Sequence, residues 1–197
     1  PRTSPFNPEP SKAWSPHPDM CGIVGIHNLA GAPVDASPLE RMLSTLHHRG
    51  PDARGIQVMG PTALGHARLS IIDLSGGAQP MTHETGSLTI TFNGEIFNYI
   101  ELRESLIKKG HSFKTQSDTE VILHLYQEKG EDCVDDLNGQ FAFSIWDPQA
   151  KRLFLARDRV GIRPLYYART QNEFIFASEL KAILSHDRIH REMDLEA

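Results

Sequence analysis

Residues 21–29 read CGIVGIHNL, an apolar run with two glycines that has the composition of a buried strand. Cys21, one of two cysteines in the chain, stands at the start of this run. Met20 before it looks like a natural start of translation. The run therefore predicts a strand that begins at a chemically reactive side chain.

A helix is expected soon after this strand. Ser37 suits the N-cap, Pro38 the first helical position and Glu40 the reciprocal capping position. Gly50 and Pro51 can end the helix. Its apolar face would consist of Leu39, Met42, Leu43 and Leu46.

Further elements follow from periodicity and turn signals. Strands are expected at residues 55–60, 63–69, 88–92, 141–146, 151–157, 165–168 and 174–177, and the alternation at 88–92 is typical of a half-buried strand. One helix would carry Tyr99, Leu102 and Leu106, and another would start at the Ser-x-x-Glu box of residues 117–120. Ser178 could cap a closing helix through Leu184.

The order of these elements favours one fold class. Strands, helices and strands again do not alternate regularly, which argues against a doubly wound parallel sheet. The pattern predicts an α+β layered fold with antiparallel sheets.

Composition excludes several classes of protein. The chain has 197 residues, 39% of them hydrophobic, and a net charge of 20 minus 25, or -5. These values are typical of a globular domain, and the sequence predicts neither a membrane span nor a nucleic-acid partner. Two cysteines are too few for a disulfide scaffold, which favours free thiols in a reducing, cytoplasmic compartment.

Residues 1–20 differ from the rest because six of them are proline. This segment is interpreted as a disordered leader, either a propeptide or a misassigned start, and it lacks the apolar core of a secretory signal. One domain would then span residues 21–197.

Cys21 is the first candidate for catalysis. A thiol attacks as its thiolate and needs a base or a lowered pKa at neutral pH. If Met20 were removed, the α-amine of Cys21 could act as that base, because such amines titrate near ~7.7–8.0. The alternative is a small buried side chain in a strand.

Three further positions each allow two interpretations. Arg68, at the end of a strand, could bind a carboxylate through two hydrogen bonds, or form an ordinary ion pair. Asn93 and Gly94 could form an oxyanion hole, or a hairpin turn, which Asn-Gly strongly favours. Asp118 could bind an ammonium group, or cap a helix.

Other patterns do not develop into sites. Residues 75–78, SGGA, start like a pyrophosphate-binding loop, but the Asp-Ser that would complete it is missing. The histidines at 47, 48, 66 and 83 lack convincing ligand spacing, so no metal site is expected.

Taken together, the motifs resemble those of the class II glutamine amidotransferase domain. They occur in the family's order as MCGI at 20–23, HRGPD at 48–52, GHARLSIID at 65–73, GAQPM at 77–81, NGEIFN at 93–98, SDTEVI at 117–122, LNGQFAF at 137–143, RDRVGIRPLY at 157–166 and ASELKA at 177–182. The wording at 49–52 and 93–98 is most similar to the N-terminal glutaminase domain of glutamine-hydrolysing asparagine synthetase.

The resemblance implies a fold and a chemistry. The fold is the αββα four-layer sandwich of N-terminal-nucleophile hydrolases, with two antiparallel sheets. Cys21 would attack the side-chain amide of L-glutamine, while Asn93 and the Gly94 N–H hold the oxyanion. Arg68 would bind the α-carboxylate and Asp118 the α-ammonium. The pocket would be lined by Leu69, Ser70, Ile71, Ile72 and Glu95, and Arg49 would organise the surroundings of the nucleophile.

The resemblance also implies partners. Ammonia would pass to an ATP-dependent synthetase domain or subunit, most simply one that makes asparagine from aspartate. The Ser-Gly-Gly-x-Asp-Ser loop of that domain is absent from the printed sequence, so ATP and magnesium are expected there and no cofactor in this chain. The resemblance also allows a homodimer. The alternatives are a different acceptor, or a non-catalytic glutamine-binding or docking module in which the leader blocks Cys21.

Overall fold

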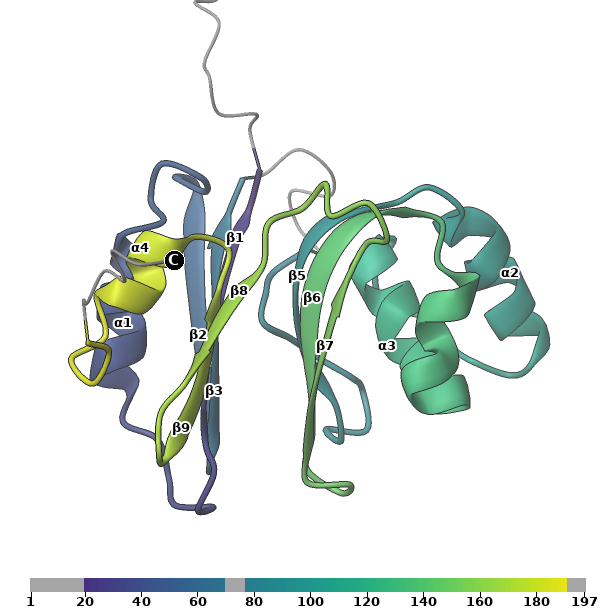
Figure 1. Ribbon diagram of the computed structural model, residues 1–197. Coiled ribbons are helices and arrows are strands. Elements are labelled where there is room, and N and C mark those ends of the chain that lie inside the picture. Colours follow the sequence, from purple (N-terminus) through teal and green to yellow (C-terminus); the bar gives the residue numbers. More distant parts are fainter. Residues whose placement is uncertain (1–19, 70–76, 191–197) are drawn as a thin grey trace, which may run out of the picture.

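The computed structural model describes residues 20–69 and 77–190, which form four layers in the order helices, sheet, sheet, helices. Figure 1 shows the two sheets face to face, with α1 and α4 outside one and α2 and α3 outside the other. This arrangement confirms the expected αββα sandwich. The leader expected at residues 1–20 lies outside the described residues, apart from Met20.

The first sheet contains the strand expected at residues 21–29. Its strand order is β2-β3-β1-β9-β8, and every pairing in it is antiparallel. The five strands are β1 (Gly22–Asn28), β2 (Ala53–Met59), β3 (Thr62–Arg68), β8 (Tyr166–Arg169) and β9 (Glu173–Ala177). Because β1 lies between β3 and β9, the backbone that follows Cys21 is hydrogen-bonded on both sides.

The second sheet is also antiparallel, with the order β4-β5-β6-β7. Its strands are β4 (Met81–Thr82), β5 (Thr89–Ile96), β6 (Gly139–Asp147) and β7 (Arg152–Arg157). β4 is only two residues long and pairs only with Thr89 and Ile90. The rest of β5 therefore has no neighbouring strand on that edge among the described residues.

Helices cover the outer face of each sheet (Figure 1). The helices are α1 (Ala36–Ser44), α2 (Tyr99–Lys108), α3 (Asp118–Lys129), the 3-10 helix η1 (Gly130–Asp136) and α4 (Leu180–Leu184). None of the helices in the described ranges has the length and apolar character that a membrane span requires.

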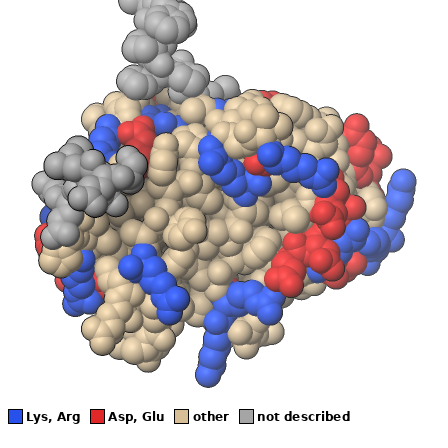
Figure 2. All heavy atoms as spheres, in the orientation of Figure 1, with Lys and Arg blue, Asp and Glu red and all other residues tan. Residues whose placement is uncertain are grey.

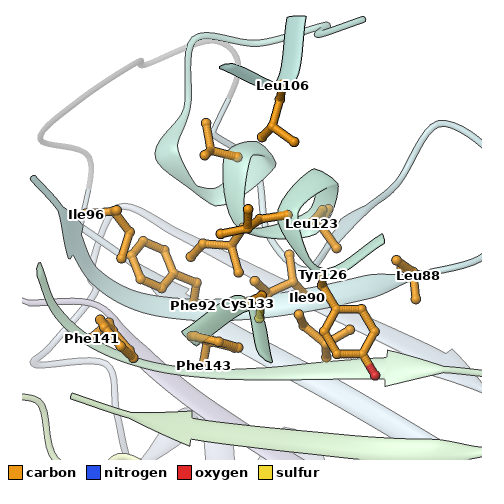
Figure 3. Close-up of a cluster of buried hydrophobic side chains, with 14 residues drawn as sticks. Leu88, Ile90, Phe92, Ile96, Leu106, Leu123, Tyr126, Cys133, Phe141 and Phe143 are labelled. Carbon is orange, nitrogen blue, oxygen red and sulfur yellow. The ribbon is translucent and has the colours of Figure 1, made fainter. Parts of the chain in front are cut away.

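Three apolar clusters hold the layers together. Figure 3 shows the one beneath α3, where Phe92 and Phe143 of the second sheet pack with helical side chains such as Leu123. A second cluster lies between α1, α4 and the first sheet. A third, which includes Ile23, Trp146 and Phe176, fills the space between the sheets. Burial of these side chains is the main force that stabilises the fold.

The expectation of a half-buried strand at residues 88–92 is wrong, because the first five residues of β5 are all buried. One face of β5 packs against the helices, and the opposite face meets the other sheet, where the Thr91 hydroxyl donates to the Gly65 carbonyl at 3.2 Å. A strand inside a sandwich alternates in polarity without being exposed, since its polar side chains find partners between the sheets.

Two predicted helix starts also need correction. Asp35, rather than Ser37, is the N-cap of α1, and its carboxylate accepts the Ser37 N–H at 3.1 Å. The helix ends by Thr45, well before Gly50. Ser178 does not cap α4, because the helix begins at Leu180 and its N-cap is Glu179. The Ser178 hydroxyl instead accepts the N–H of Ile23 in β1.

The capping box expected at residues 117–120 forms only in part. Ser117 is the N-cap of α3 and accepts the Thr119 N–H at 3.1 Å. Glu120 does not return a bond to Ser117, because its carboxylate accepts the backbone N–H groups of Lys114 and Thr115 at 2.8 and 2.7 Å. Glu120 therefore fixes the loop that leads into α3.

Candidate active site

A cavity of about 160 Å³ opens where β1 begins and β3 ends. Side chains from both sheets and from the start of α3 line it, so the site depends on the packing of three layers. The sequence-predicted residues that reach the cavity are Cys21, Arg68, Leu69, Asn93, Gly94, Glu95 and Asp118. The predictions for Ser70, Ile71 and Ile72 fall outside the described residues.

Cys21 is a partly buried free thiol directly before β1. Its Sγ accepts the Leu69 N–H at 3.4 Å and lies 3.7 Å from the Leu69 carbonyl. Burial raises the pKa of this thiol, although the bond from Leu69 and the charges of Arg68 and Arg49 oppose the shift. Since the thiolate is the nucleophile, Cys21 needs a base to take its proton at neutral pH.

Cys133 offers a useful contrast because it is also a free thiol. It is fully buried in the cluster under α3, and burial raises its pKa to about 12. A thiol of this kind packs as a small apolar side chain and is chemically inert. Cys21 is therefore the cysteine placed for chemistry.

Asn93 and Gly94 lie within β5 and pair with Ala142 and Phe141 of β6. The hairpin turn that the Asn-Gly dipeptide favours is therefore not formed here. Asn93 is buried, and its Nδ2 donor has no hydrogen-bond partner among the described residues. A buried amide without a partner is costly, which indicates that a ligand atom completes this site.

The Gly94 N–H points to the cavity edge of β5. N–H groups two residues apart in a strand point the same way. The Phe92 N–H donates to Oε1 of Gln79 at 2.6 Å, and the Ile96 N–H donates to Oδ2 of Asp118 at 3.1 Å. Gly94 lies between them, so its N–H faces this same edge, beside the Asn93 amide.

No side chain fits at position 94. A Cβ there would lie 2.2 Å from the Gln140 carbonyl oxygen and 2.7 Å from the Phe141 Cα. Glycine is therefore required for the close pairing of β5 with β6, and it also leaves the backbone N–H open to a ligand.

Arg68 and Asp118 bring opposite charges to the cavity from different layers of the fold. Arg68 is the last residue of β3, and Asp118 is the first residue of α3. Asp118 is not the helix cap that its position first indicates, since Ser117 takes that role and the Asp118 carboxylate instead binds the Ile96 N–H. Burial raises the pKa of Asp118 against the effect of that bond.

Arg49 does not line the cavity but holds the backbone beside it. Its Nε donates to the Cys21 carbonyl at 3.1 Å, and its Nη1 donates to Glu179 at 3.0 Å. This agrees with a supporting role rather than direct contact with a ligand.

Several residues that line the cavity were not predicted from the sequence, among them His66, Gln79 and Arg163. His66 precedes Arg68 by two positions in a strand, so the two side chains share a face. Gln79 and Arg163 fall within the GAQPM and RDRVGIRPLY motifs, which give no indication of pocket contact. Gln79 links β5 to α3, because its Nε2 also donates to Thr119 at 3.4 Å.

His66 is fully buried and neutral. Its Nε2 lies 3.1 Å from the Phe92 carbonyl and must carry the proton, since a carbonyl only accepts. Its Nδ1 is then a bare acceptor with no partner among the described residues. Burial lowers its pKa to about 4, and the charge of Arg68 acts in the same direction.

Within the described ranges, no group of three or more His, Cys, Asp or Glu side chains is arranged to hold a metal ion. Charges on the visible surface are mixed. Figure 2 shows basic side chains spread over one face, with acidic ones gathered mainly on the side that carries α2 and α3.

Comparison with known families gives one match over most of the chain. The family model described as "Glutamine amidotransferase domain" matches residues 20–197. The asparagine synthetase [glutamine-hydrolyzing] 3 of Bacillus subtilis (strain 168) is 44% identical over 178 residues, which cover 89% of this chain and 29% of that protein. A probable asparagine synthetase [glutamine-hydrolyzing] of Dictyostelium discoideum is 45% identical over 170 residues, 83% of this chain and 30% of that protein.

Solved structures agree on the fold. The glutamine phosphoribosylpyrophosphate amidotransferase from B. subtilis has a TM-score of 0.70 and 26% identity, covering 84% of this chain and 43% of that one. A structure described as the allosteric regulatory enzyme of purine biosynthesis has a TM-score of 0.68. The chain spans less than a third of the length of these two asparagine synthetases.

Proposed function

This chain belongs to the glutamine amidotransferase domain family, and it matches the glutaminase portion of the glutamine-hydrolysing asparagine synthetases. From that premise we propose that its cavity hydrolyses L-glutamine to L-glutamate and ammonia, with Cys21 as nucleophile. One observation carries the proposal. Cys21, Arg68, Asp118 and Asn93, whose Nδ2 has no partner among the described residues, all line the same cavity.

The charges of the cavity suit a glutamine zwitterion. Arg68 would pair with the α-carboxylate, for which a guanidinium offers two parallel hydrogen bonds. Asp118 would pair with the α-ammonium from a different layer of the fold. Because these groups lie on β3 and α3, they would fix the backbone of the substrate and direct its side-chain amide toward Cys21.

The chemistry then has two stages. The α-amine of Cys21 takes the thiol proton, and the sulfur attacks the amide carbon to form a tetrahedral oxyanion. Asn93 Nδ2 and the Gly94 N–H donate to that oxygen. The amine returns the proton to the departing nitrogen, which leaves as ammonia, and a thioester remains on Cys21. Water then adds to the thioester, which releases glutamate and restores the thiol.

The α-amine can serve as base only when Cys21 is the first residue. In the printed chain this nitrogen forms an amide bond with Met20, and an amide nitrogen has no basic lone pair. Removal of residues 1–20 would therefore switch on the reaction. With them attached, the domain would bind glutamine without hydrolysing it.

The destination of the ammonia follows from the relatives. Three relatives at 44–45% identity are named as asparagine synthetases, and each is more than three times as long as the matched segment. We therefore propose an ATP-dependent synthetase domain as partner, with aspartate as the acceptor. ATP and magnesium would bind there. The two free thiols fit a reducing compartment such as the cytoplasm.

Glutamate release tests the proposal directly. The printed chain and a form that begins at Cys21 are compared, each also as Cys21→Ala and Cys133→Ala. Activity is expected only in the form that begins at Cys21. It should disappear in Cys21→Ala and persist in Cys133→Ala, which controls for the loss of a thiol. If folded protein that begins at Cys21 released no glutamate, the chain would be a glutamine-binding or docking module instead.

A further inference from the structure

A second acid lies behind the nucleophile, outside the cavity. Glu179 lies two residues after the end of β9, and its side chain is 22% exposed. Its Oε1 accepts from Arg49 Nη1 at 3.0 Å and lies 2.8 Å from His48 Nε2. Its Oε2 lies 3.1 Å from Lys181 Nζ. Burial opposes ionisation, but the bonds from Arg49, His48 and Lys181 outweigh it and lower the pKa of Glu179 to about 2.

Arg49 connects this acid to the nucleophile. The Arg49 side chain is only 8% exposed, so its charge needs a counter-ion. Glu179 is the counter-ion, and the Nε of the same guanidinium binds the Cys21 carbonyl at 3.1 Å. A continuous path of two hydrogen bonds therefore runs from the Glu179 carboxylate to the peptide that follows the thiol.

Ser178, next to Glu179, also binds the start of β1. Ser178 binds Ile23 by two hydrogen bonds, each 2.9 Å long, one from the Ile23 N–H to the Ser178 hydroxyl and one from the Ser178 N–H to the Ile23 carbonyl. Gly22 has little space around it, because a Cβ there would lie 3.0 Å from Leu46 Cδ1. The backbone of residues 21–23 is thus fixed from residues 178–179.

We propose that Glu179 is a positioning residue for the nucleophile: it holds Arg49 against the Cys21 carbonyl and balances the guanidinium charge beside the thiol. This inference rests on the proposed function, because it takes Cys21 as the reacting group. The two parts of this role can be measured separately. Holding Arg49 in place depends on a hydrogen-bond acceptor at position 179, whereas balancing the guanidinium depends on the negative charge of Glu179.

Several other charged side chains act on Cys21, Arg49 or Glu179, and they also affect the pKa of the thiol. Arg68 and Arg49 both act on the Cys21 thiol, and Arg163 lies near both Cys21 and Arg49. Glu95 acts on Arg163 from β5. His48 and Lys181 surround the Glu179 carboxylate itself, as described above.

Two substitutions separate charge from shape. Glu179→Gln keeps an oxygen that can accept from Arg49 but removes the negative charge. The uncompensated guanidinium then favours the thiolate, so the thiol pKa falls. Glu179→Ala removes the hold on Arg49 altogether, which should misplace the nucleophile and lower kcat.

Glu173 provides the matched control. It is the first residue of β9, and like Glu179 it pairs with one arginine and one histidine, Arg188 at 3.0 Å and His186 at 3.5 Å. It is not among the residues that line the cavity of Cys21. Glu173→Gln and Glu173→Ala therefore report what is lost when a paired acid of β9 is removed without touching the nucleophile.

The experiment measures the alkylation rate of Cys21 by iodoacetamide against pH, together with kcat and KM for glutamine. In Glu179→Gln the midpoint of alkylation should fall by about half a pH unit. In Glu179→Ala kcat should fall about tenfold or more, with KM changed less than about twofold. Both Glu173 variants should match the wild type in these readouts.

Two results would overturn the inference. One is an unchanged alkylation midpoint in Glu179→Gln together with an unchanged kcat in Glu179→Ala. The other is an equal effect of the Glu173 variants, which would indicate a general loss of stability. Alkylation does not require glutamine turnover, so a wild-type protein that releases no glutamate would defeat the proposed function while the midpoint still decides the role of Glu179.

Discussion

Ser178 closes a ring of two hydrogen bonds on Ile23, 155 positions earlier in the chain. Ile23 is fully buried and stands two residues after Cys21, in the middle strand of the first sheet. The segment that connects β9 to α4 therefore fixes the start of β1, and with it the position of the nucleophile.

Loss of the Ser178 hydroxyl should destabilise the protein. In Ser178→Ala the buried Ile23 N–H loses its acceptor, which costs about 1–3 kcal/mol of unfolding free energy. Urea unfolding measures the change. Ser185→Ala is the control, because the Ala182 carbonyl that accepts the Ser185 hydroxyl also accepts the Ser185 N–H. A loss as large in Ser185→Ala would contradict a specific role for Ser178.

Asn93 should act on the transition state more than on glutamine binding. Its Nδ2 is buried without a partner among the described residues, and the proposed oxyanion is the acceptor it lacks. Asn93→Ala should lower kcat by about 10²–10³-fold and leave KM nearly unchanged. Steady-state kinetics check this, with the exposed Asn172→Ala as control. A change confined to KM would place Asn93 in substrate binding instead.

Asp118 should control the affinity for glutamine. Asp118→Asn removes the proposed partner of the α-ammonium and should raise KM by at least about tenfold, the loss expected when one member of a buried charge pair is removed. Asp135→Asn, an exposed acid of η1, should leave KM unchanged. An equal KM in the Asp118 variant would show that the ammonium binds elsewhere.

Asp118 should also make glutamine binding depend on pH. Burial raises the pKa of Asp118, so its carboxylate gains a proton at a higher pH than an ordinary aspartate does. As pH falls, the attraction for the ammonium is lost and KM should rise. In Asp118→Asn this acidic rise should be absent, and KM measured across the acidic range tests it. A rise of equal size in both proteins would assign the effect to another group.

His66 should make the fold sensitive to acid. Its folded pKa of about 4 lies below the ordinary 6.5, so below pH 6.5 the unfolded chain binds a proton that the folded protein refuses. Stability from this group is complete above 6.5 and falls as pH is lowered toward 4, by about 2 kcal/mol at pH 5.

The substitution His66→Gln removes this titration and can still donate to the Phe92 carbonyl. The unfolding free energy of the variant, measured by urea between pH 7 and pH 4.5, should therefore fall less steeply than that of the wild type. Parallel curves for the two proteins would mean that His66 does not cause the acid sensitivity. The control is His190→Gln, an exposed histidine outside the cavity.

Local patterns in the sequence located the strands well. Periodicity placed β2, β3, β6, β7, β8 and β9 within two residues, because alternation reflects which face of a strand is covered. It could not reveal that β5 is covered on both faces, since that depends on the second sheet. The Asn-Gly dipeptide at 93–94 favours a turn locally, but pairing with β6 overrides that preference.

The candidate site also has a part that the sequence predicts and a part that it does not. Cys21, Arg68, Asn93 and Asp118 followed from residue chemistry and the order of the motifs. The supporting contacts did not, because they join distant segments: Glu179 reaches Arg49 across 130 positions. Nothing local marks such a pair, whereas the spacing of His66 and Arg68 in one strand was a usable signal that was missed.

Covalent labelling shows whether Cys21 is the nucleophile of a glutamine site. A glutamine analogue with an electrophilic diazoketone in place of the amide is incubated with protein that begins at Cys21, and the adduct is located by peptide mass spectrometry. We expect one adduct, on Cys21, that glutamine suppresses and that Asp118→Asn slows. An adduct on Cys133, or none on folded protein, would contradict Cys21 as the nucleophile of a glutamine site.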